Sequence, residues 1–379
     1  MKDLVNPFSL DAYISKELFC DRKKEVEDLY QACMNGRNVT LISHRRMGKT
    51  GLIYRFFDEI AERHRPNKFI TLYADSYATQ NIKEFTQVLA EAIFKQLSGK
   101  TTIAKRLRRL LTSLQAVVSY NTLTGEPNIS ISLKDNISFD YSLKQLFTFL
   151  EAQQVPVIFA IDEFQQVAAY PEKNAEALLR SIIQHLTNVH FIFSGSNRGM
   201  MTEIFAGASR PFFASTQFIS LEPIPRAIYK NFIIEKFANN KRIIEEEAVD
   251  FILDWTYAHT YYTQALCNHI YAKNEKHINL PFAKQCCHAL LELQAGSFIQ
   301  YRNLLTPAQW SLLRAIAKEG EATNLTGAAF AQKYGITASS VQRILPVMVE
   351  KQMVMELTDR EKTHYRLYDC FFGKWLASL

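Results

Sequence analysis

Short apolar runs alternate with stretches of helical periodicity between residues 21 and 221. Between the runs, apolar residues recur every three or four positions, as in Phe85, Leu89 and Ile93, which is typical of amphipathic helices. The run before Asp162 is almost continuously apolar and predicts a central strand buried on both faces. This alternation predicts an α/β fold, a parallel sheet with helices on both faces. The expected strands are Val39–Ile42, Lys68–Asp75, Val155–Ile161, Val189–Phe193 and Thr216–Leu221.

The helices of this part follow from the same periodicity. They are expected over residues 21–36, 49–60, 82–97, 140–154 and 175–186. In the first of them, Asp21 can cap the start and Gly36 can end the helix. A helix that feeds the first strand in this way can carry one wall of a ligand pocket, or can serve packing alone.

Residues 98–138 interrupt the alternation and are interpreted as an insertion. A basic helical segment is followed by a turn at residues 124–127 and then by an alternating strand with Ile129, Ile131 and Leu133. A solvated helix face is the default interpretation of such a basic run, and an anionic partner is the alternative. The cations of the segment are Lys100, Lys105, Arg106, Arg108 and Arg109.

The pattern changes after Pro223. Residues 224–303 are helical throughout and predict a small all-α domain. Residues 304–379 predict helix, helix, turn, helix and a β-hairpin, which is the order of a winged helix–turn–helix. Pro346 lies inside the third of these helices and is expected to kink or shorten it. The predicted domains are therefore residues 1–223, 224–303 and 304–379.

The loop after the first strand carries the main candidate chemistry. Gly48-Lys49-Thr50 opens a helix, which is the phosphate-binding P-loop arrangement, although Ser43 stands where the consensus has glycine. Backbone N–H groups and the helix N-terminus supply partial positive charge for a polyphosphate. Lys49 would reach the β- and γ-phosphates, and the Thr50 hydroxyl would bind Mg²⁺. The candidate binding residues here are Ser43, Arg45, Arg46, Met47, Gly48, Lys49, Thr50 and Gly51.

Polar residues end two later strands. Asp162 and Glu163 follow the central strand, at the edge where open α/β sheets bind ligands. Asp162 would hold Mg²⁺, and Glu163 would polarise the attacking water; the alternative is a pair that caps a helix. Ser196 and Asn197 follow the next strand and would orient the γ-phosphate or the water, or cap a helix instead.

The amino-acid composition excludes few functional classes of protein. The 379 residues are 47% hydrophobic and 22% charged, which is ordinary for a globular protein, and the net charge of +6 permits nucleic-acid contact without requiring it. The six cysteines form no CxxC pair and are expected to be reduced. Neither a signal-peptide core near the start nor an apolar run of membrane-spanning length is apparent. We therefore expect a cytoplasmic protein without a membrane partner.

Several short sequence motifs together resemble those of a known protein family. The chain resembles archaeal-type AAA-like ATPases of the STAND superclass, with a winged helix at the C-terminal end. The resemblance implies a P-loop NTPase sheet, ATP with Mg²⁺ as cofactors, and a helical lid over the nucleotide. The residues that carry it are Cys20-Asp21-Arg22, Arg45–Thr50, Ile161–Gln165, Phe193–Ser196, Arg210-Pro211-Phe212, Leu221–Pro223, Tyr365, Asp369, Phe372 and Trp375.

The resemblance also implies roles for residues outside the two phosphate motifs. Asp21 and Arg22 would line the adenine side of the pocket. Tyr262 and Gln264 resemble the lid motif that faces the nucleotide. Arg210, or Arg198, would stabilise charge during hydrolysis.

The expected function is a slow ATPase that acts as a nucleotide-dependent switch, moving the lid and the winged helix. One alternative is a non-hydrolysing ATP-binding scaffold whose winged helix docks a protein. Another is a DNA-binding regulator or initiator-like ATPase. The C-terminal domain has nine Lys and Arg against seven Asp and Glu, with Gln342 and Arg343 on the presumed recognition helix. Double-stranded DNA and a protein therefore both remain open as partners, as does a nucleotide-dependent oligomer.

Overall fold

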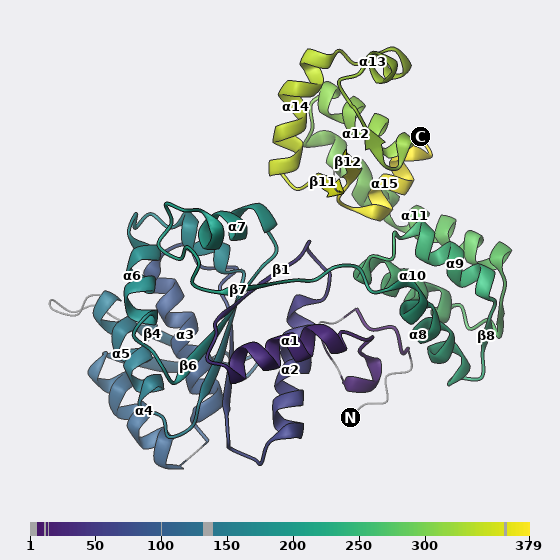
Figure 1. Cartoon of the computed structure of the whole chain (residues 1–379). Coiled ribbons are helices and arrows are strands. Elements are labelled where there is room, and N and C mark those ends of the chain that lie inside the picture. The colour runs from purple at the N-terminus through teal and green to yellow at the C-terminus, as the bar shows by residue number, and fades with distance from the viewer. Residues whose placement is uncertain (1–5, 11–12, 14, 100, 132–138, 360–361) are drawn as a thin grey trace. The chain divides into compact units, whose positions relative to one another are not determined.

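The computed structural model of the chain describes residues 6–10, 13, 15–99, 101–131, 139–359 and 362–379. Lys100 and Leu133, which the sequence analysis assigns to the insertion, lie outside these residues. The chain divides into two compact units (Figure 1). The first unit is Asp11–Pro223, and the second is Met1–Leu10 together with Ile224–Leu379. Each unit is described by itself.

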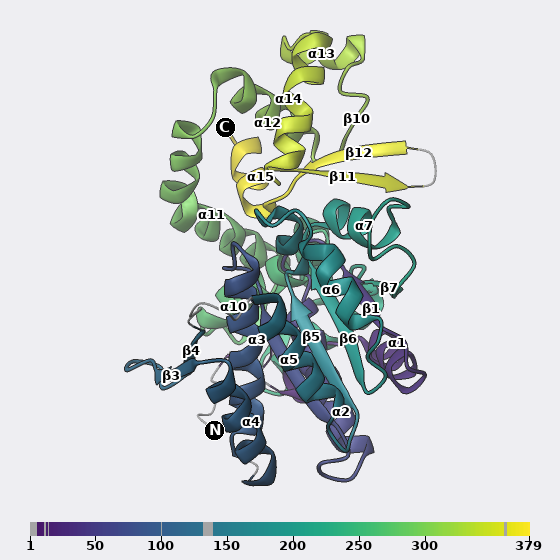
Figure 2. The same cartoon turned by 90° about the vertical axis from the view of Figure 1, so that its left-hand side faces the viewer.

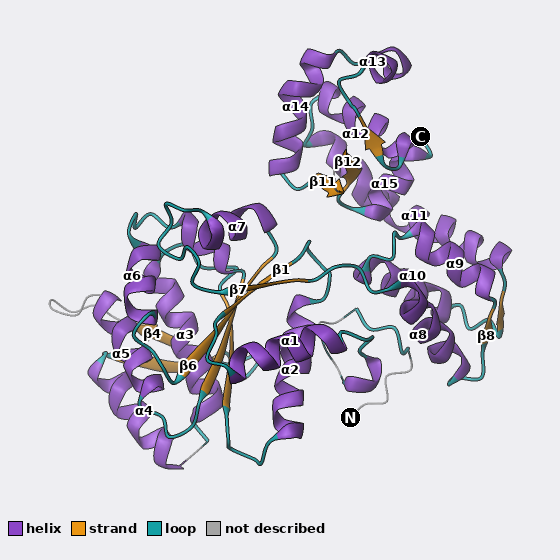
Figure 3. Ribbon diagram, viewed as in Figure 1, coloured by secondary structure: helices purple, strands orange, loops and turns teal. Residues whose placement is uncertain are grey.

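A five-stranded parallel sheet forms the centre of the first unit (Figures 2 and 3). The strand order is β2-β5-β6-β1-β7, and every neighbouring pair is parallel. The five strands predicted from the apolar runs are confirmed. They are β1 (Val39–Ile42), β2 (Ile70–Asp75), β5 (Val157–Asp162), β6 (Val189–Gly195) and β7 (Gln217–Ser220).

Helices cover both faces of this sheet, and each face has its own core. Residues of β5 alternate between the two cores: Phe159 and Ile161 belong to the larger one, Ile158 and Ala160 to the smaller. This alternation explains why β5 is apolar at nearly every position. The smaller core is formed with α1 (Lys23–Met34) and α2 (Lys49–Arg63). The larger core includes α3 (Ile82–Leu97), α4 (Thr101–Ser113), α5 (Phe139–Glu151), α6 (Ala175–Ile183) and α7 (Arg198–Ala206).

The insertion is α4 followed by an antiparallel hairpin. Its strands are β3 (Ala116–Tyr120) and β4 (Pro127–Ile131). The sequence analysis predicts the helix and the second strand but not β3. Two 3₁₀ helices, η1 (Lys16–Leu18) and η2 (Phe164–Ala169), were not predicted either.

The expected cap of α1 is wrong. Arg22, not Asp21, occupies the N-cap position, and no side chain caps the helix there. Asp21 and Arg22 both have left-handed backbone conformations, with φ of 56° and 65°. This turn places Asp21 one residue outside the position from which a side chain reaches the free N–H groups of the first helical turn.

Four helices form the first part of the second unit. They are α8 (Arg226–Ala238), α9 (Glu246–Trp255), α10 (Thr260–Ala272) and α11 (Leu280–Asn303), joined by a short parallel pair, β8 (Ile243–Ile244) and β9 (His277–Ile278), that was not predicted. The N-terminal segment packs here as well. The ring of Phe8 is fully buried, with its centroid 5.0 Å from that of Phe237. The side chain of Asn268 donates a hydrogen bond to the carbonyl of Phe8 at 2.7 Å.

The second part of this unit is the predicted winged helix. Thr306 and Gln309 form a capping box at the start of α12 (Pro307–Glu319). The helix α14 (Ala338–Glu350) runs through Pro346, so the expected shortening at that residue is wrong. The other elements are α13 (Ala328–Tyr334), β10 (Ala322–Thr323), β11 (Val354–Asp359), β12 (Lys362–Leu367) and α15 (Cys370–Ala377). Neither β10 nor α15 was predicted.

Within the part of the chain that is described, no helix has the length and apolar character that a bilayer crossing would need.

Candidate functional site

The P-loop connects β1 to α2 at the carboxyl end of the sheet. Arg46 and Gly48 have left-handed conformations, with φ of 64° and 95°, and Gly48 is the N-cap of α2. Glycine relieves the strain of that conformation at the residue where the loop turns into the helix. Ser43 is buried, and its hydroxyl donates a hydrogen bond to the carbonyl of His44 at 2.8 Å. Arg45 and Arg46 are exposed at the tip of the loop, whereas Met47 is buried.

Lys49 is the buried cation of the site. Only 6% of its surface is exposed, and its Nζ lies 3.3 Å from Ser43 Oγ, to which it donates a hydrogen bond. Burial lowers the pKa of Lys49, while the carboxylates of Asp162 and Glu163 partly offset that effect and Arg45 adds to it. A buried ammonium group is costly unless an anion accompanies it. The site therefore fits a bound anion such as a polyphosphate.

Asp162 joins α2 to the neighbouring strands. Its Oδ2 accepts a hydrogen bond from the Thr50 hydroxyl at 2.8 Å and another from the Tyr73 hydroxyl at 2.9 Å. Hydroxyl and carboxylate oxygens are the ligands that Mg²⁺ prefers, so Thr50 and Asp162 together fit this metal. The sequence analysis missed Tyr73. No pattern in the sequence marks it, because its place beside Asp162 follows from the sheet register, which pairs Asp75 with Asp162.

Glu163 is held by two groups from different elements. It has a left-handed conformation, with φ of 53°. Its Oε2 accepts a hydrogen bond from the Ser196 hydroxyl at 2.7 Å, and the Gln165 side-chain amide also donates to it. A Cβ atom at Gly195 would lie 2.3 Å from Gln165 Oε1, so a side chain there would displace Gln165. Gln165 stands in the run Ile161–Gln165, but the sequence analysis gave it no role.

The other residues expected near the phosphates have contacts of different kinds. Asn197 is the N-cap of α7, and its side chain accepts a hydrogen bond from the N–H of Met200 at 3.1 Å. Arg210 lies between α6 and α7, where it forms ion pairs with Glu176 at 3.2 Å and Glu203 at 2.9 Å. Arg198 lies beside β7 instead, with its Nη2 3.4 Å from Ser220 Oγ.

Arg22 is a second buried cation of the first unit. It is 3% exposed, and its Nη1 donates to Glu25 at 2.8 Å and to the carbonyl of Glu222 at 2.6 Å. Its Nη2 is buried and has no hydrogen-bond partner within the described part of the chain. Arg22 thus connects the start of α1 to the last residues of the first unit.

Tyr262 and Gln264 lie on α10 in the second unit. The Tyr262 ring is buried, and its centroid is 4.9 Å from that of Phe371 on α15. Its hydroxyl donates to the carbonyl of Tyr368 at 3.4 Å. Gln264 is half-buried. The predicted lid residue Tyr262 therefore packs against the last helix of the winged helix.

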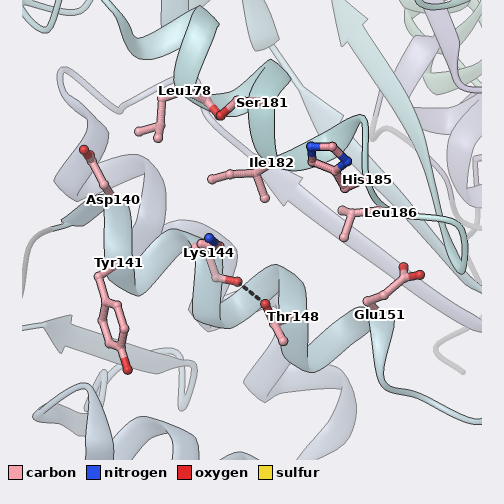
Figure 4. A pocket seen from close by; sticks show the side chains of 10 residues that line it. All are labelled: Asp140, Tyr141, Lys144, Thr148, Glu151, Leu178, Ser181, Ile182, His185 and Leu186. Carbon is pink, nitrogen blue, oxygen red and sulfur yellow. Dashed lines mark hydrogen bonds between the residues drawn. The ribbon is translucent and has the colours of Figure 1, made fainter.

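A cavity of about 540 Å³ lies elsewhere in the first unit, between α5 and α6 (Figure 4). Leu178, Ile182 and Leu186 form its apolar part, and Lys144 and Glu151 line it from α5. None of the P-loop or strand-end residues described above belongs to its lining. The candidate site for a nucleotide is therefore the carboxyl end of the sheet and not this cavity.

Comparisons with known proteins identify the family of the first domain. A family model described as "ATPase domain predominantly from Archaea" matches residues 19–261, and one described as "Probable winged helix domain" matches residues 296–378. A sequence search of curated proteins finds no match.

Solved structures share the fold at low sequence identity. The Walker-type ATPase PABY2304 of Pyrococcus abyssi is 18% identical, with a TM-score of 0.66, and 98% of this chain and 99% of that chain are covered. The ORC2 protein of Aeropyrum pernix, solved as ADPNP-ADP complexes, is 14% identical, with a TM-score of 0.58 and coverage of 98% and 95%. The Aeropyrum pernix ORC1 protein in complex with DNA is 12% identical, with a TM-score of 0.51 and coverage of 95% and 92%. The chain belongs to the family of ATPase domains found predominantly in Archaea, and it carries a winged helix after that domain.

Proposed function

We propose that this protein binds Mg-ATP at the carboxyl end of its parallel sheet and hydrolyses it slowly, as a nucleotide-dependent switch. The observation that carries the proposal is the meeting of the two phosphate motifs. Thr50 and Asp162 are 112 residues apart in the chain, yet Thr50 Oγ1 lies 2.8 Å from Asp162 Oδ2. The buried Lys49 belongs to the same group of charges.

The roles of the residues follow from their chemistry. The Lys49 ammonium and the backbone N–H groups at the start of α2 bind the β- and γ-phosphates. The Thr50 hydroxyl and the Asp162 carboxylate hold Mg²⁺, which neutralises developing charge on the phosphates when it is bound. Glu163 orients the attacking water, and Ser196 orients Glu163. The hydrogen bonds described for the Glu163 side chain all go to Oε2, which leaves Oε1 to accept a hydrogen bond from the water.

Slow turnover is proposed from the ion pairs of Arg210. Arg210, the expected source of extra positive charge, is engaged by Glu176 and Glu203. A cation that stabilises the transferring phosphoryl group accelerates such reactions by several orders of magnitude. With Arg210 held in these ion pairs, the site relies on Lys49 and Mg²⁺ for charge stabilisation.

The switch is proposed from contacts inside the second unit, between the domains assigned to residues 224–303 and 304–379. Tyr262 of the lid packs against Phe371, and Cys370 Sγ donates to the carbonyl of Trp255 at 3.4 Å. The Arg366 guanidinium lies 4.0 Å from the centre of the Tyr257 ring, in the range of a cation–π interaction. A movement of the lid on nucleotide binding would therefore carry the winged helix with it.

A second candidate is an initiator-like ATPase that binds double-stranded DNA. The observation that favours it is the winged helix itself, which exposes Gln342 and Arg343 on α14. The likeness of fold to an ORC1 protein solved with DNA supports the same candidate. A winged helix that docks a protein remains the competing use of this domain.

Calorimetric titration in magnesium tests nucleotide binding. The wild type is expected to bind ATP and ADP more tightly than GTP, and Lys49→Ala to weaken ATP binding at least about tenfold. Lys68→Ala removes an exposed lysine of the same unit and serves as the control. A wild type that binds no nucleotide would refute the proposal.

Phosphate release tests hydrolysis separately. Glu163→Gln is expected to lower the turnover of Mg-ATP by about 100-fold or more while ATP still binds. Glu247→Gln, which changes an exposed carboxylate on α9, should leave turnover unchanged. Equal, background release by the wild type and Glu163→Gln would leave the non-hydrolysing scaffold as the function.

A further inference from the structure

A stretch that overlaps the insertion of the first unit carries positive charge and no carboxylate. The whole chain has 44 Lys and Arg against 38 Asp and Glu, a net charge of +6. The stretch from Ala92 to Gly125 contains six Lys and Arg and no Asp or Glu. Four of these six cations belong to α4, and one, Lys95 at the end of α3, forms an ion pair with Glu126.

The helix α4 presents this charge on one face. Figure 2 shows α4 beside α3 and α5, followed by the β3–β4 hairpin. Leu107, Leu111 and Leu114 are buried in the core of the unit, which fixes the opposite face of the helix toward water. The cations Lys105, Arg106, Arg108 and Arg109 are all exposed on that face. No carboxylate among the described residues forms an ion pair with any of the four.

The other polar groups of this face are already engaged. The Thr112 hydroxyl donates to the carbonyl of Arg108 at 2.9 Å, and the Ser113 hydroxyl donates to the carbonyl of Leu110 at 2.7 Å. The groups that this face offers to a partner are therefore mainly positively charged hydrogen-bond donors. Guanidinium groups bind phosphate oxygens in pairs of hydrogen bonds, which makes arginine suited to phosphate contacts.

We propose that the exposed basic face of α4 binds the phosphate backbone of double-stranded DNA. The four cations lie within about 6 Å along the helix axis, at about 1.5 Å per residue. Duplex DNA carries one charge per about 1.7 Å of its axis, so about four phosphates lie within the same length. This surface belongs to the first unit and is distinct from the winged helix, which is part of the second.

The same face fits other anionic partners less well. A membrane-bound helix inserts apolar residues between the lipids, but the apolar residues of α4 are buried in the core. Single strands need aromatic side chains on which bases can stack, and α4 has none. Duplex RNA also presents phosphates, so the test below compares it directly with duplex DNA.

Binding of the full-length protein to a fluorescent DNA duplex of about 20 base pairs, measured from 50 to 200 mM salt, tests the proposal. The test variant is Lys105→Gln/Arg106→Gln/Arg108→Gln/Arg109→Gln. It is expected to weaken binding by tenfold or more at 50 mM salt. The slope of log affinity against log salt should become shallower by about 3 to 4, since each phosphate contact contributes about 0.9.

The matched control is Arg37→Gln/Arg65→Gln/Lys68→Gln/Lys173→Gln, which removes four exposed cations of the same unit from other elements. It is expected to bind DNA within about twofold of the wild type, because its cations lie outside the α4 face. The double variants Lys105→Gln/Arg109→Gln and Arg106→Gln/Arg108→Gln should each produce about half of the change in slope expected for the quadruple variant. They keep the test decisive if the quadruple variant does not fold. Unchanged thermal unfolding shows that a variant is folded.

Four outcomes overturn the proposal. The first is a wild type that does not bind the duplex at 50 mM salt. The second is equal loss of binding in the α4 variant and the control, which would indicate a diffuse charge effect. The third is loss of binding only in Arg343→Gln/Lys351→Gln, which would assign the contact to the winged helix. The fourth is α4-dependent binding of an RNA duplex or of anionic lipid vesicles that is as tight as that of DNA.

Discussion

The hydroxyl of Ser196 donates a hydrogen bond of 2.7 Å to Oε2 of Glu163, although the two residues are 33 positions apart in the chain. Ser196 follows β6 and Glu163 follows β5, and these strands are parallel neighbours in the sheet. The parallel order brings both strand ends to the same edge. The serine thus fixes the orientation of the residue proposed to activate water.

Replacement of Ser196 by alanine is expected to lower turnover. Among the described residues, Ser196→Ala leaves Gln165 as the one side chain that donates to Glu163, so the carboxylate loses part of its fixed orientation. The expected fall in kcat is about tenfold, less than the loss of the carboxylate itself would cause. ATP affinity should not change. Ser196→Thr retains the hydroxyl and should stay within about threefold of the wild type, and an equal or higher kcat for the alanine variant would contradict this role.

Removal of the Tyr73 hydroxyl is expected to weaken the metal site. The hydroxyl donates to Asp162 Oδ2, and burial together with the nearby Asp162 charge raises the pKa of Tyr73, so the hydroxyl stays protonated at neutral pH. Residues that hold a metal ligand in place typically contribute 10- to 100-fold to metal affinity. Tyr73→Phe should raise the half-saturating Mg²⁺ concentration for phosphate release by about tenfold. Tyr77→Phe changes an exposed tyrosine just beyond β2 and should have no such effect.

The buried ammonium of Lys49 is expected to destabilise the nucleotide-free protein. Burial lowers the pKa of Lys49 in the folded state, so the unfolded chain binds more protons at this residue between the lowered pKa and the ordinary value of 10.5. The stability of the folded state therefore rises with pH through that window and is lowest below it. Lys49→Met should raise the Tm of the nucleotide-free protein at pH 7 by about 2 °C, as expected for about 1 kcal/mol.

The same variant should respond differently to ligand. Mg-ATP is expected to raise the Tm of the wild type, because a ligand that binds only the folded state stabilises it. It should leave the Tm of Lys49→Met unchanged. A lower Tm for nucleotide-free Lys49→Met than for the wild type would show that the ammonium is stabilising and that the sign of this argument is incorrect.

Loss of Arg22 is expected to destabilise the first unit. Its guanidinium is buried and connects Glu25 to the carbonyl of Glu222. Arg22→Ala leaves the partly buried Glu25 without its cation and the Glu222 carbonyl without this donor. Removal of one member of a buried ion pair costs about 3 kcal/mol. Urea unfolding should show this loss in the transition of the first unit, or in a common transition if the two units unfold together. Lys23→Ala, which removes an exposed neighbour, should change stability by less than about 0.5 kcal/mol.

Elements with a strong local pattern were predicted closely. β1 and α3 have the bounds that their apolar spacing indicates, Val39–Ile42 and Ile82–Leu97. Short elements with few residues of their own were missed, namely β3, β10 and the pair β8 and β9. Three of these strands have only two residues, and the five residues of β3 do not alternate between apolar and polar positions, so neither case shows a strand pattern. Such a strand is stabilised by the strand with which it pairs.

The sequence by itself identified Lys49, Thr50, Asp162 and Glu163 as candidate site residues, because each belongs to a motif that is contiguous in the chain and ends a recognisable strand or begins a helix. Only the tertiary structure decided the partners of those groups. Tyr73 reaches Asp162 across the β2–β5 pair, and Gln165 with Ser196 reaches Glu163. Such contacts depend on strand order and register, which arise from packing between distant segments and leave no signal at any one position of the chain.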